Sequence, residues 1–484
     1  MEIIGSLILS IIQSILFYGK QIGISMLIFE IVCNGIILFV LNKKEKIQNK
    51  AGLWLMVPIV LLSSTYFIFA NRTFYVANIF VIFALNFIMY VILTNQKGTL
   101  TNYLYKTGML FTDTVGEWQD GLKLSEKVAN EHLSVKKKTV NFKKIAKSVL
   151  IVCVVVGIVL ILLSSADSIF ANLFSGIGRI FTHINTANTF NLILRIVIIV
   201  MVYFLFLSFI LKLQEELEED EYTHKVEEKD TFTIKILLVT LNIVYLIFCF
   251  IQIQSLFARI NIQDSFDYAN YARSGFFQLM FVSFINLAVI LISNRYNAKK
   301  EKNIKILNLM LVVFTIIIAI SSMYRMHMYE MEYGLTYLRM FVYIILITEI
   351  IAFIPIVKYI LDDKFDFMKW CFGICIGAYC VANLMNIENV IVSRNLTRES
   401  IRSIDYNYLS NIASEDSYII LEEKLQDQNI DLKEETAIEN ILINIKKNEK
   451  QLSWQEFNIS KMRIQKRRTN IRQMREETYN SDYE

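Results

Sequence analysis

The sequence predicts an all-α protein: a polytopic transmembrane helical bundle of about eleven spans, followed by a small helical C-terminal domain. Three observations lead to this fold class. Hydrophobic residues make up 55% of the 484-residue chain, and its mean hydropathy of +0.44 indicates repeated membrane crossings. Apolar runs long enough to cross the hydrocarbon core, about 20 residues in a helix, recur along the chain. Pro58 and Pro355 both lie inside such runs, where proline kinks a membrane helix rather than ends it.

The apolar runs define the predicted spans, of which the first is the shortest. They lie at residues 3–18, 22–41, 53–70, 76–94, 148–165, 190–213, 232–256, 275–293, 304–323, 341–360 and 370–391. Four regions follow from them. These are N-terminal transmembrane helices (1–94), a basic cytoplasmic insert (95–147), a transmembrane core (148–391) and a helical extracytoplasmic tail (392–484).

Basic residues in the linkers predict the orientation, because lysine and arginine collect on the cytoplasmic side. One alternating set of linkers holds 23 of them, at residues 42–52, 95–147, 214–231, 294–305 and 361–369. The other set holds 7, at residues 19–21, 71–75, 166–189, 257–274 and 324–340. We therefore expect a multi-pass protein of the cell membrane with a cytoplasmic N-terminus and an extracytoplasmic C-terminus.

Two linkers have unusual composition. The linker at 214–231 is strongly acidic, and we interpret it as a solvated connector; a divalent-cation sensor is the alternative, although no fixed ligand spacing supports it. In residues 166–189, apolar side chains recur at helical spacing, which predicts an amphipathic helix on the outer leaflet.

The tail after residue 391 has the pattern of folded helices. Two capping boxes are predicted, Thr436 with Glu439 and Ser453 with Glu456, in which each pair satisfies amides at a helix N-terminus. Apolar residues follow the first box at helical spacing: Ile438, Ile441, Leu442 and Ile445. The end, "KMRIQKRRTNIRQMR", is basic, which is typical of a solvated helix face or of binding to anionic lipid or wall polymer.

The motifs of known chemistry are missing from the sequence. It contains no HExxH, G-x-S-x-G, P-loop or G-x-G-x-x-G motif. The histidines are scattered over different linkers, so we expect no metal site and no cofactor. The small net charge of +4, with no concentrated basic field, gives no indication of nucleic acid.

A candidate polar cluster lies at the predicted outer membrane face. It is formed by two stretches, "YANYARSGFFQLM" and "SSMYRMHMYEMEYGLTYLR", and comprises Tyr268, Tyr271, Arg273, Arg325, Glu330, Glu332, Thr336 and Arg339. The glycine at position 334 is expected to end the ninth helix, which would turn Arg339 back toward Glu330 or Glu332. These charges either pair to orient adjacent helices or form a pocket for an anionic group.

Several ordered motifs give the chain a family resemblance. The stretches "LFYGKQIGISMLIFE", "LLSSADSIFANLF", "YANYARSGFFQLM", "RMHMYEMEYGLTYLR", "RSIDYNYLS" and "WQEFNISKMR" resemble the bacterial membrane family known as domain of unknown function 4173, and more distantly family 4153. The resemblance implies the architecture and a tail that belongs to the same unit. It implies no activity.

Three hypotheses for function follow. The first is a non-enzymatic integral membrane protein of the bacterial cell envelope, acting as a scaffold, sensor or assembly partner, with the lipid bilayer and an envelope protein as its partners. The second is a transporter or channel-like protein that binds an anionic solute or lipid headgroup at the arginine cluster. The third is a membrane enzyme that uses Glu330 or Glu332 as a general base.

Overall fold

The computed structural model describes most of the chain. The described residues are 1–70, 73–95, 98–116, 186–215, 231–257, 265–297, 301–362, 364–397, 404–427, 430–447 and 452–465. In these residues the secondary structure is helical and includes no strand, so the predicted all-α class is confirmed. Nine of the described helices are long and apolar enough to cross a membrane. The protein is therefore a helical integral membrane protein.

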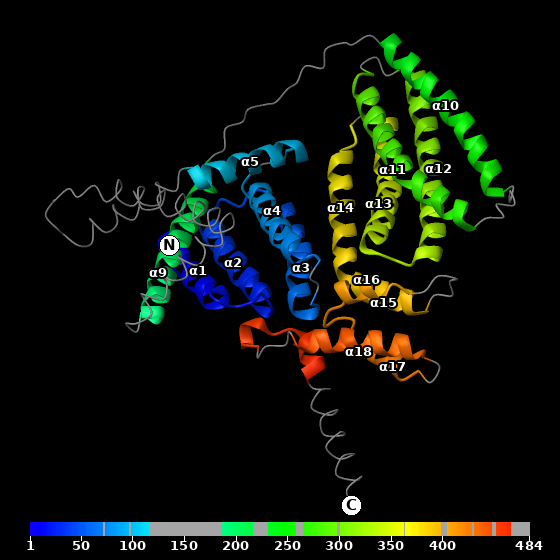
Figure 1. Ribbon diagram of the computed structural model, residues 1–484. Coiled ribbons are helices and arrows are strands. Elements are labelled where there is room, and N and C mark those ends of the chain that lie inside the picture. Colours follow the sequence, from blue (N-terminus) through cyan, green and yellow to red (C-terminus); the bar gives the residue numbers. More distant parts are fainter. Residues whose placement is uncertain are drawn as a thin grey trace, which may run out of the picture.

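The first group of helices, here called the N-terminal bundle, is shown in blue to blue-green in Figure 1. It consists of α1 (Glu2–Phe17), α2 (Ile24–Lys43), η1 (Lys50–Leu55), α3 (Met56–Ile68), α4 (Tyr75–Thr94), α5 (Leu100–Gly116) and α9 (Thr186–Lys212). The 3₁₀-helix η1 runs directly into α3. The sequence pattern did not single out α5, which crosses one end of the bundle and inserts Leu110 into its core.

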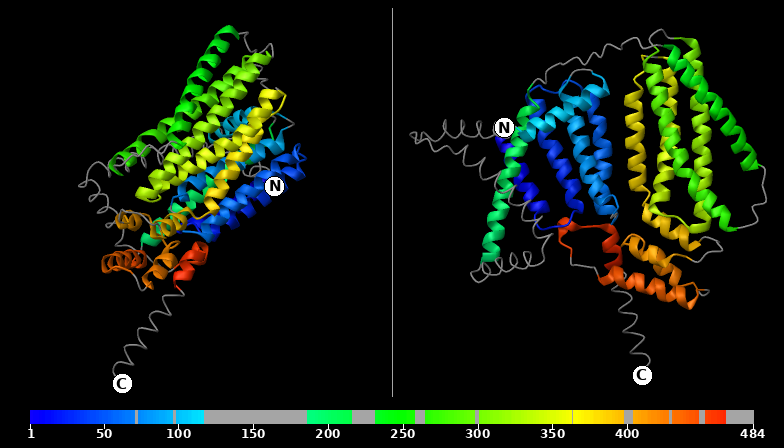
Figure 2. Two further views of the ribbon diagram at one scale, coloured as in Figure 1. Left: turned by 90° about the vertical axis from the view of Figure 1, so that its right-hand side faces the viewer. Right: turned by 45° about the horizontal axis from the view of Figure 1, so that its top comes forward.

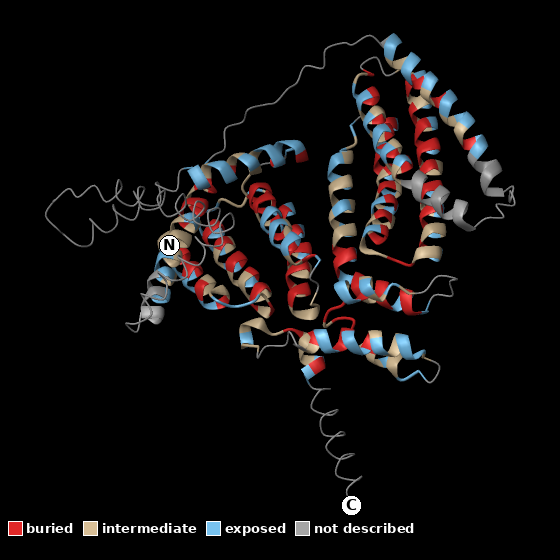
Figure 3. Ribbon diagram, viewed as in Figure 1, coloured by how far each residue is buried: buried red, intermediate tan, exposed pale blue. Residues whose placement is uncertain are grey.

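The second group, here called the C-terminal bundle, contains the long helices drawn in green to yellow. They are α10 (Thr231–Phe257), α11 (Ser265–Arg295), α12 (Lys302–Tyr333), α13 (Tyr337–Leu361) and α14 (Phe367–Leu384). Its core is mainly aliphatic and gathers around α12, with Leu311 and Phe353 fully or almost fully buried. Figure 3 shows buried residues along α12 and mostly exposed residues along α10. The exposed side chains include large apolar ones such as Phe250, as expected of a surface that faces lipid.

The two bundles meet where α14 packs against α3. Beside that contact, in the first turn of α4, Asn78 Nδ2 donates to Asn383 Oδ1 of α14 at 2.7 Å, and the Tyr379 hydroxyl donates to Asn78 Oδ1 at 2.6 Å. The ring of Phe74 packs edge-on against both Phe341 and Tyr379. The interface therefore combines paired amides with aromatic packing.

The tail folds into a small helical layer across one end of both bundles, here called the platform (residues 387–465). It contains α15 (Ile387–Thr397), α16 (Tyr406–Ile412), α17 (Tyr418–Leu425), α18 (Leu432–Lys447) and η3 (Trp454–Glu456). The views of Figure 2 agree that it lies beneath the membrane helices. Its core holds all four residues predicted at helical spacing, Ile438, Ile441, Leu442 and Ile445. Burial of these side chains holds the platform together.

The two ends of the bundles match the two predicted sets of linkers. Residues 18–23, 69–70, 73–74 and 334–336 lie at the platform, on what we call the platform side. The described linker residues 44–49, 95, 98–99, 296–297, 301, 362 and 364–366 lie at the opposite end, the insert side. The described linkers thus alternate between the two ends, as predicted. The assignment of the insert side to the cytoplasm stays a prediction.

Some predicted boundaries differ from the structure. The first apolar run forms α1, which at 16 residues is shorter than the nine candidate spans. The run at 370–391 is divided, because α14 ends at Leu384 and Asn386 adopts a left-handed conformation with φ +48° before α15 begins. Residues 387–391 therefore belong to the platform.

The remaining sequence-based predictions have different outcomes. The capping box at Thr436 is wrong: α18 begins at Leu432, so Thr436 lies inside the helix and donates to the Leu432 carbonyl at 2.8 Å. The box of Ser453 with Glu456 is confirmed. The run at 148–165, residues 166–185 of the amphipathic stretch, almost all of the acidic linker and residues 466–475 of the basic end lie outside the described residues.

Candidate functional site

The turn between α12 and α13 holds part of the predicted polar cluster. As expected, α12 continues to Tyr333 and ends at Gly334, whose φ of +81° suits glycine because a Cβ would be strained there. Thr336 is the N-cap of α13, and its hydroxyl accepts from the Arg339 amide at 3.4 Å. The turn brings the last turn of α12 beside the first turn of α13.

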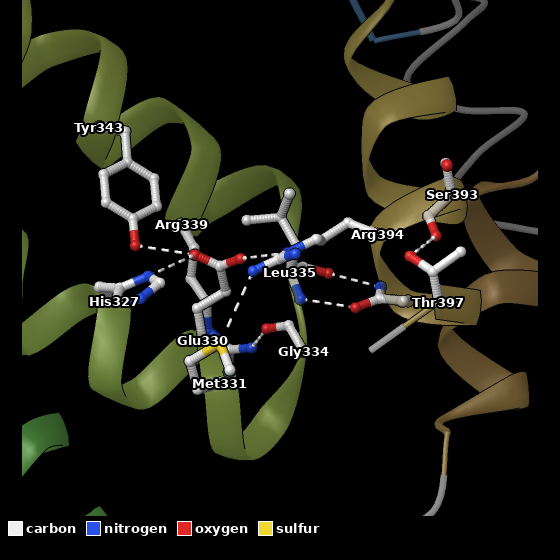
Figure 4. Close-up of polar contacts among 11 residues, drawn as sticks. His327, Glu330, Met331, Gly334, Leu335, Arg339, Tyr343, Ser393, Arg394 and Thr397 are labelled. Atoms are coloured by element: carbon white, nitrogen blue, oxygen red, sulfur yellow. Dashed lines mark hydrogen bonds and ion pairs between the residues drawn. The ribbon is translucent and has the colours of Figure 1, made fainter. Parts of the chain in front are cut away.

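Glu330 is the centre of this cluster (Figure 4). Its carboxylate accepts from the Tyr343 hydroxyl at 2.9 Å and from Arg394 Nε at 3.3 Å, and His327 Nδ1 lies 3.6 Å away. Tyr343 comes from α13, whereas Arg394 comes from α15 of the platform. The carboxylate therefore joins three helices through charge-assisted hydrogen bonds.

Arg339 also contacts the turn between α12 and α13. Its guanidinium donates to the Gly334 carbonyl and lies over the Tyr329 ring, 4.2 Å from the ring centroid. Arg325 is buried on α12 with an interaction partner inside the protein. The structure brings Glu330, Thr336 and Arg339 together. Both Arg325 and Arg339 interact with other groups inside the protein.

The remaining predicted residues are placed only in part. Tyr268, Tyr271 and Arg273 lie in the first turns of α11, which begins early, as their helical spacing predicted. Their side chains are outside the described part of the structure. Glu332 lies two residues past Glu330 and takes part in an interaction of its own. Whether Arg273 joins the cluster stays a prediction.

A two-point clamp fixes the platform to the C-terminal bundle. Asn395 Oδ1 accepts from the Leu335 amide at 2.6 Å, and Asn395 Nδ2 donates to the Leu335 carbonyl at 2.8 Å. Next to it, the Tyr408 hydroxyl accepts from the Tyr337 amide at 2.9 Å. The amides near the start of α13 would otherwise lack partners, so these side chains complete the helix terminus.

A second set of contacts fixes the platform to the N-terminal bundle. Asn458 Nδ2 donates to the carbonyls of Tyr66 and Phe69, at 2.9 and 2.8 Å, at the end of α3. The Asp416 carboxylate accepts from the Ala70 amide at 2.9 Å. Asn458 is buried, so the loss of these bonds would leave polar groups unsatisfied.

Gly23 lies where the platform touches the start of α2. A Cβ at this position would meet the backbone of Glu456 at 2.6 Å, closer than atoms can approach. The close approach lets the Ile24 amide donate to the Phe457 carbonyl at 3.1 Å, and lets the Gln21 amide donate to Glu456. Backbone therefore packs directly on backbone at this joint.

One buried acid organises the interior of the platform. Glu388 accepts from the amide and the hydroxyl of Ser414, both at 2.6 Å, and from the hydroxyl of Ser417 at 2.7 Å. Burial, reinforced by the nearby Asp416 carboxylate, raises the pKa of Glu388 to about 7, although the serine hydrogen bonds oppose the rise. This carboxyl group therefore titrates near neutral pH.

Residues 56–423 match the family described as "Domain of unknown function (DUF4153)". The match covers more than half of the chain. This protein belongs to the DUF4153 family. That family is the one the sequence motifs indicated as the more distant likeness, and the likeness to family 4173 stays a prediction. No match was found among the curated proteins or among the solved structures.

The DUF4153 match runs from the start of α3 into α17, so it includes the Asn395 clamp and the adjacent Tyr408 contact that hold the platform to the C-terminal bundle. It leaves out α1, α2 and η1 at one end and α18 and η3 at the other. These two outer parts touch each other, through the joint of Ile24 with Phe457 described above. The chain thus closes around its DUF4153 region by a contact between the segments that flank it.

The sequence reasoning missed Glu388, Arg394 and Asn395, which all belong to α15. Their short stretch looked like the end of a span, and single polar residues there gave no spacing signal. A signal did exist for Tyr408 and Asn458, since both lie within motifs that carried the family resemblance, "RSIDYNYLS" and "WQEFNISKMR". Among the described residues, no three His, Cys, Asp or Glu side chains gather where a metal ion could bind.

Proposed function

We propose that this DUF4153 protein is a non-enzymatic scaffold of the bacterial cell envelope, in which two membrane bundles hold the platform as a fixed binding surface for an envelope protein. In this proposal the insert side is cytoplasmic and the platform is extracytoplasmic, as the basic residues of the linkers indicate. The observation that carries the proposal is the double attachment of the platform.

The attachments support a fixed platform because they are buried and reach both bundles. The clamp of Asn395 binds backbone of the C-terminal bundle, and Asn458 binds backbone of the N-terminal bundle. Buried backbone groups paired in this way are costly to release. A platform that served only as a loose tail would need neither joint. A fixed surface is pre-organised, which lowers the entropy lost when a partner binds.

The engaged arginines support the same proposal. Arg339 donates to its own turn and stacks on Tyr329, and Arg394 pairs with Glu330. Each contact orders the helix ends next to the platform. The sequence left two interpretations of the cluster open: charges that pair to orient helices, or a pocket for an anionic group. These contacts support the first.

Affinity purification tests the proposal. We expect the tagged full-length protein, extracted in mild detergent, to retain an envelope protein in stoichiometric amount. Asn395→Ala should reduce this recovery, because the clamp on Leu335 is lost and the platform is no longer held in place. Asn440→Ala is the matched control, since Asn440 is exposed on α18 and the substitution leaves the clamp intact.

Two results would contradict the scaffold. One is repeated recovery of the protein alone from several detergents, with membrane abundance normal. The other is equal recovery of the partner by the Asn395→Ala and Asn440→Ala variants when proteolysis shows that only the first has loosened its platform.

A transporter or channel-like protein is the second candidate, and buried polar side chains that cross the C-terminal bundle favour it. On this hypothesis an anionic solute or lipid headgroup binds at the arginine cluster on the platform side. Arg339→Ala should then abolish binding or uptake while membrane abundance stays normal. Failure of Arg339→Ala to accumulate in the membrane would instead assign the arginine a structural role.

A further inference from the structure

The C-terminal bundle contains a buried acid that the platform does not use. Glu349 lies at the middle of α13, twelve residues from either end, or roughly 18 Å along the helix axis. Its side chain is buried between α13 and α11, with 6% of the residue exposed. Its Oε2 has one partner, the Ser283 hydroxyl at 2.8 Å, and its Oε1 has none.

If Glu349 were ionised, the Ser283 hydroxyl would lack the hydrogen atoms to bond both of its neighbours. Ser283 Oγ lies 2.8 Å from the Met280 carbonyl oxygen and 2.8 Å from Glu349 Oε2. A hydroxyl has one hydrogen to donate, and both neighbours are acceptors unless the carboxyl group carries a proton. A neutral Glu349 resolves this, because Ser283 then donates to Met280 and accepts from the acid.

Glu30 in the N-terminal bundle shows the contrasting arrangement. Its Oε2 accepts from Asn86 Nδ2 at 2.9 Å and from Asn34 Nδ2 at 3.1 Å. The same two amide groups donate their other hydrogens to carbonyls one turn earlier, those of Ile82 and of Glu30 itself, which fixes their orientation. Two N–H donors therefore converge on Glu30, and this carboxylate needs no proton to fill its contacts.

A column of buried polar side chains leads from Glu349 toward the insert side. Next to it, Asn286 accepts from the Tyr245 hydroxyl at 2.7 Å and donates to Thr315 at 3.1 Å. Further along, Ser293 donates to Asn308 at 2.7 Å. Thr315 and Asn308, the two α12 residues that contact α11 here, are seven residues apart. This is about two helical turns, so both side chains lie on the same face of α12.

The column ends at the insert side, where Asn297 accepts from the Glu301 amide at 2.9 Å and Glu301 pairs with Lys235. Near this end, polar atoms remain without a protein partner: Asn242 Oδ1, Asn294 Oδ1 and Asn308 Nδ2. Buried atoms of this kind bind ordered water. Water and hydroxyl groups together can relay a proton.

We propose that Glu349 is a proton-binding site, held as a neutral carboxylic acid at the middle of the C-terminal bundle and exchanging its proton with water on the insert side along this column. The ligand is H⁺, which converts the carboxylate to the acid. A metal cation would need several converging oxygen ligands, and the described contacts of Glu349 supply one.

Other titratable or charged groups lie on the helices around Glu349. They are Tyr245 on α10, Arg325 and Tyr329 on α12, Tyr343 on α13 and Cys371 on α14. Arg325 lies in the part of α12 nearer the platform, and none of these groups forms an ion pair or hydrogen bond with the Glu349 carboxyl among the described residues. A proton on the acid itself therefore removes its charge.

Infrared difference spectroscopy on the full-length protein in liposomes tests the site at neutral pH. The spectrum of wild type minus Glu349→Gln should contain the carbonyl band of a protonated carboxylic acid. The spectrum of wild type minus Glu30→Gln should lack that band. Ser283→Ala retains the acid but removes its neighbour, so its acid band should shift; this variant tests the site even if Glu349→Gln does not fold.

A carboxylate band in place of the acid band for Glu349 would overturn the proposal. So would a Ser283→Ala spectrum identical to that of the wild type. The path is tested by transfer into D₂O, which shifts the acid band as the proton exchanges. We expect Asn308→Leu to slow this shift several-fold and Tyr343→Phe, on the platform side, to leave it unchanged. The opposite pattern would overturn the path to the insert side.

Discussion

The two membrane bundles bury acids of opposite character. In the N-terminal bundle, Glu30 receives two amide N–H donors, and Tyr90 extends the network by donating to Asn34 Oδ1 at 2.6 Å. In the C-terminal bundle, Glu349 has only a hydroxyl that is also close to a carbonyl, and one of its own oxygens has no partner. Around Glu30 one buried atom is left without a partner, Asn86 Oδ1.

The difference shows how each bundle accommodates a buried acid. A polar group in a low-dielectric interior must be paired or neutral. The Glu30 network is paired, which suits a rigid structural element that holds α2 against α4. The Glu349 column contains buried polar atoms without a hydrogen-bond partner in the protein, which suits a place where protons and water exchange. The predictions below test this contrast in order of expected size.

The largest effect is expected from Asn34→Leu. This substitution removes the partner of Tyr90 and one donor to Glu30 in a buried network, which should lower the free energy of unfolding by roughly 3–4 kcal/mol. Asn308→Leu in the C-terminal bundle should cost about 1 kcal/mol, because Asn308 Nδ2 already has no partner. Steric trapping in bicelles measures both. Equal losses would remove the contrast between the bundles.

The next effect concerns a buried acid of the platform, Glu388, and depends on pH. Its pKa is about 7 in the folded protein against an ordinary 4.5, so the folded state holds more protons than the unfolded state between these values. The stability is thus fully present below pH 4.5. The free energy of unfolding should fall as the pH rises from 4.5 to 7, by up to roughly 3 kcal/mol.

Thermal unfolding of the purified protein across this pH range measures the effect. Glu388→Gln, which resembles the protonated acid in shape and charge, should flatten the dependence. A variant that keeps the full pH dependence would show that other groups cause it, and that burial alone does not decide how an acid behaves at the edge of the membrane.

The smallest effect sharpens the contrast between paired and unpaired groups outside the membrane. Ser453→Ala should cost about 1 kcal/mol, because Ser453 and Glu456 form a capping box next to the joint with α2. Thr436→Ala is the matched control and should be close to neutral, since Thr436 lies inside α18 and is exposed. Chemical denaturation distinguishes the two; a larger loss for Thr436→Ala would contradict the structure.

The sequence by itself determined the membrane helices and their alternation. Runs of about 20 apolar residues are set by the thickness of the hydrocarbon core and need no tertiary information. The end of α12 at Gly334 was predicted because glycine at a helix end has a local cause. The same holds for the capping box at Ser453 and for the buried face of α18, where the pattern lies within a few neighbouring residues.

Only the tertiary structure decided which polar groups meet. Glu330 pairs with Arg394, 64 residues away, and Asn458 reaches the end of α3 across 389 residues or more. The Thr436 capping box failed because packing of the platform core lets α18 begin one turn earlier. Glu349 and Ser283 lie on different helices, and their contact depends on how α11 and α13 are rotated against each other. Such pairings follow from helix packing, which a hydropathy pattern does not specify.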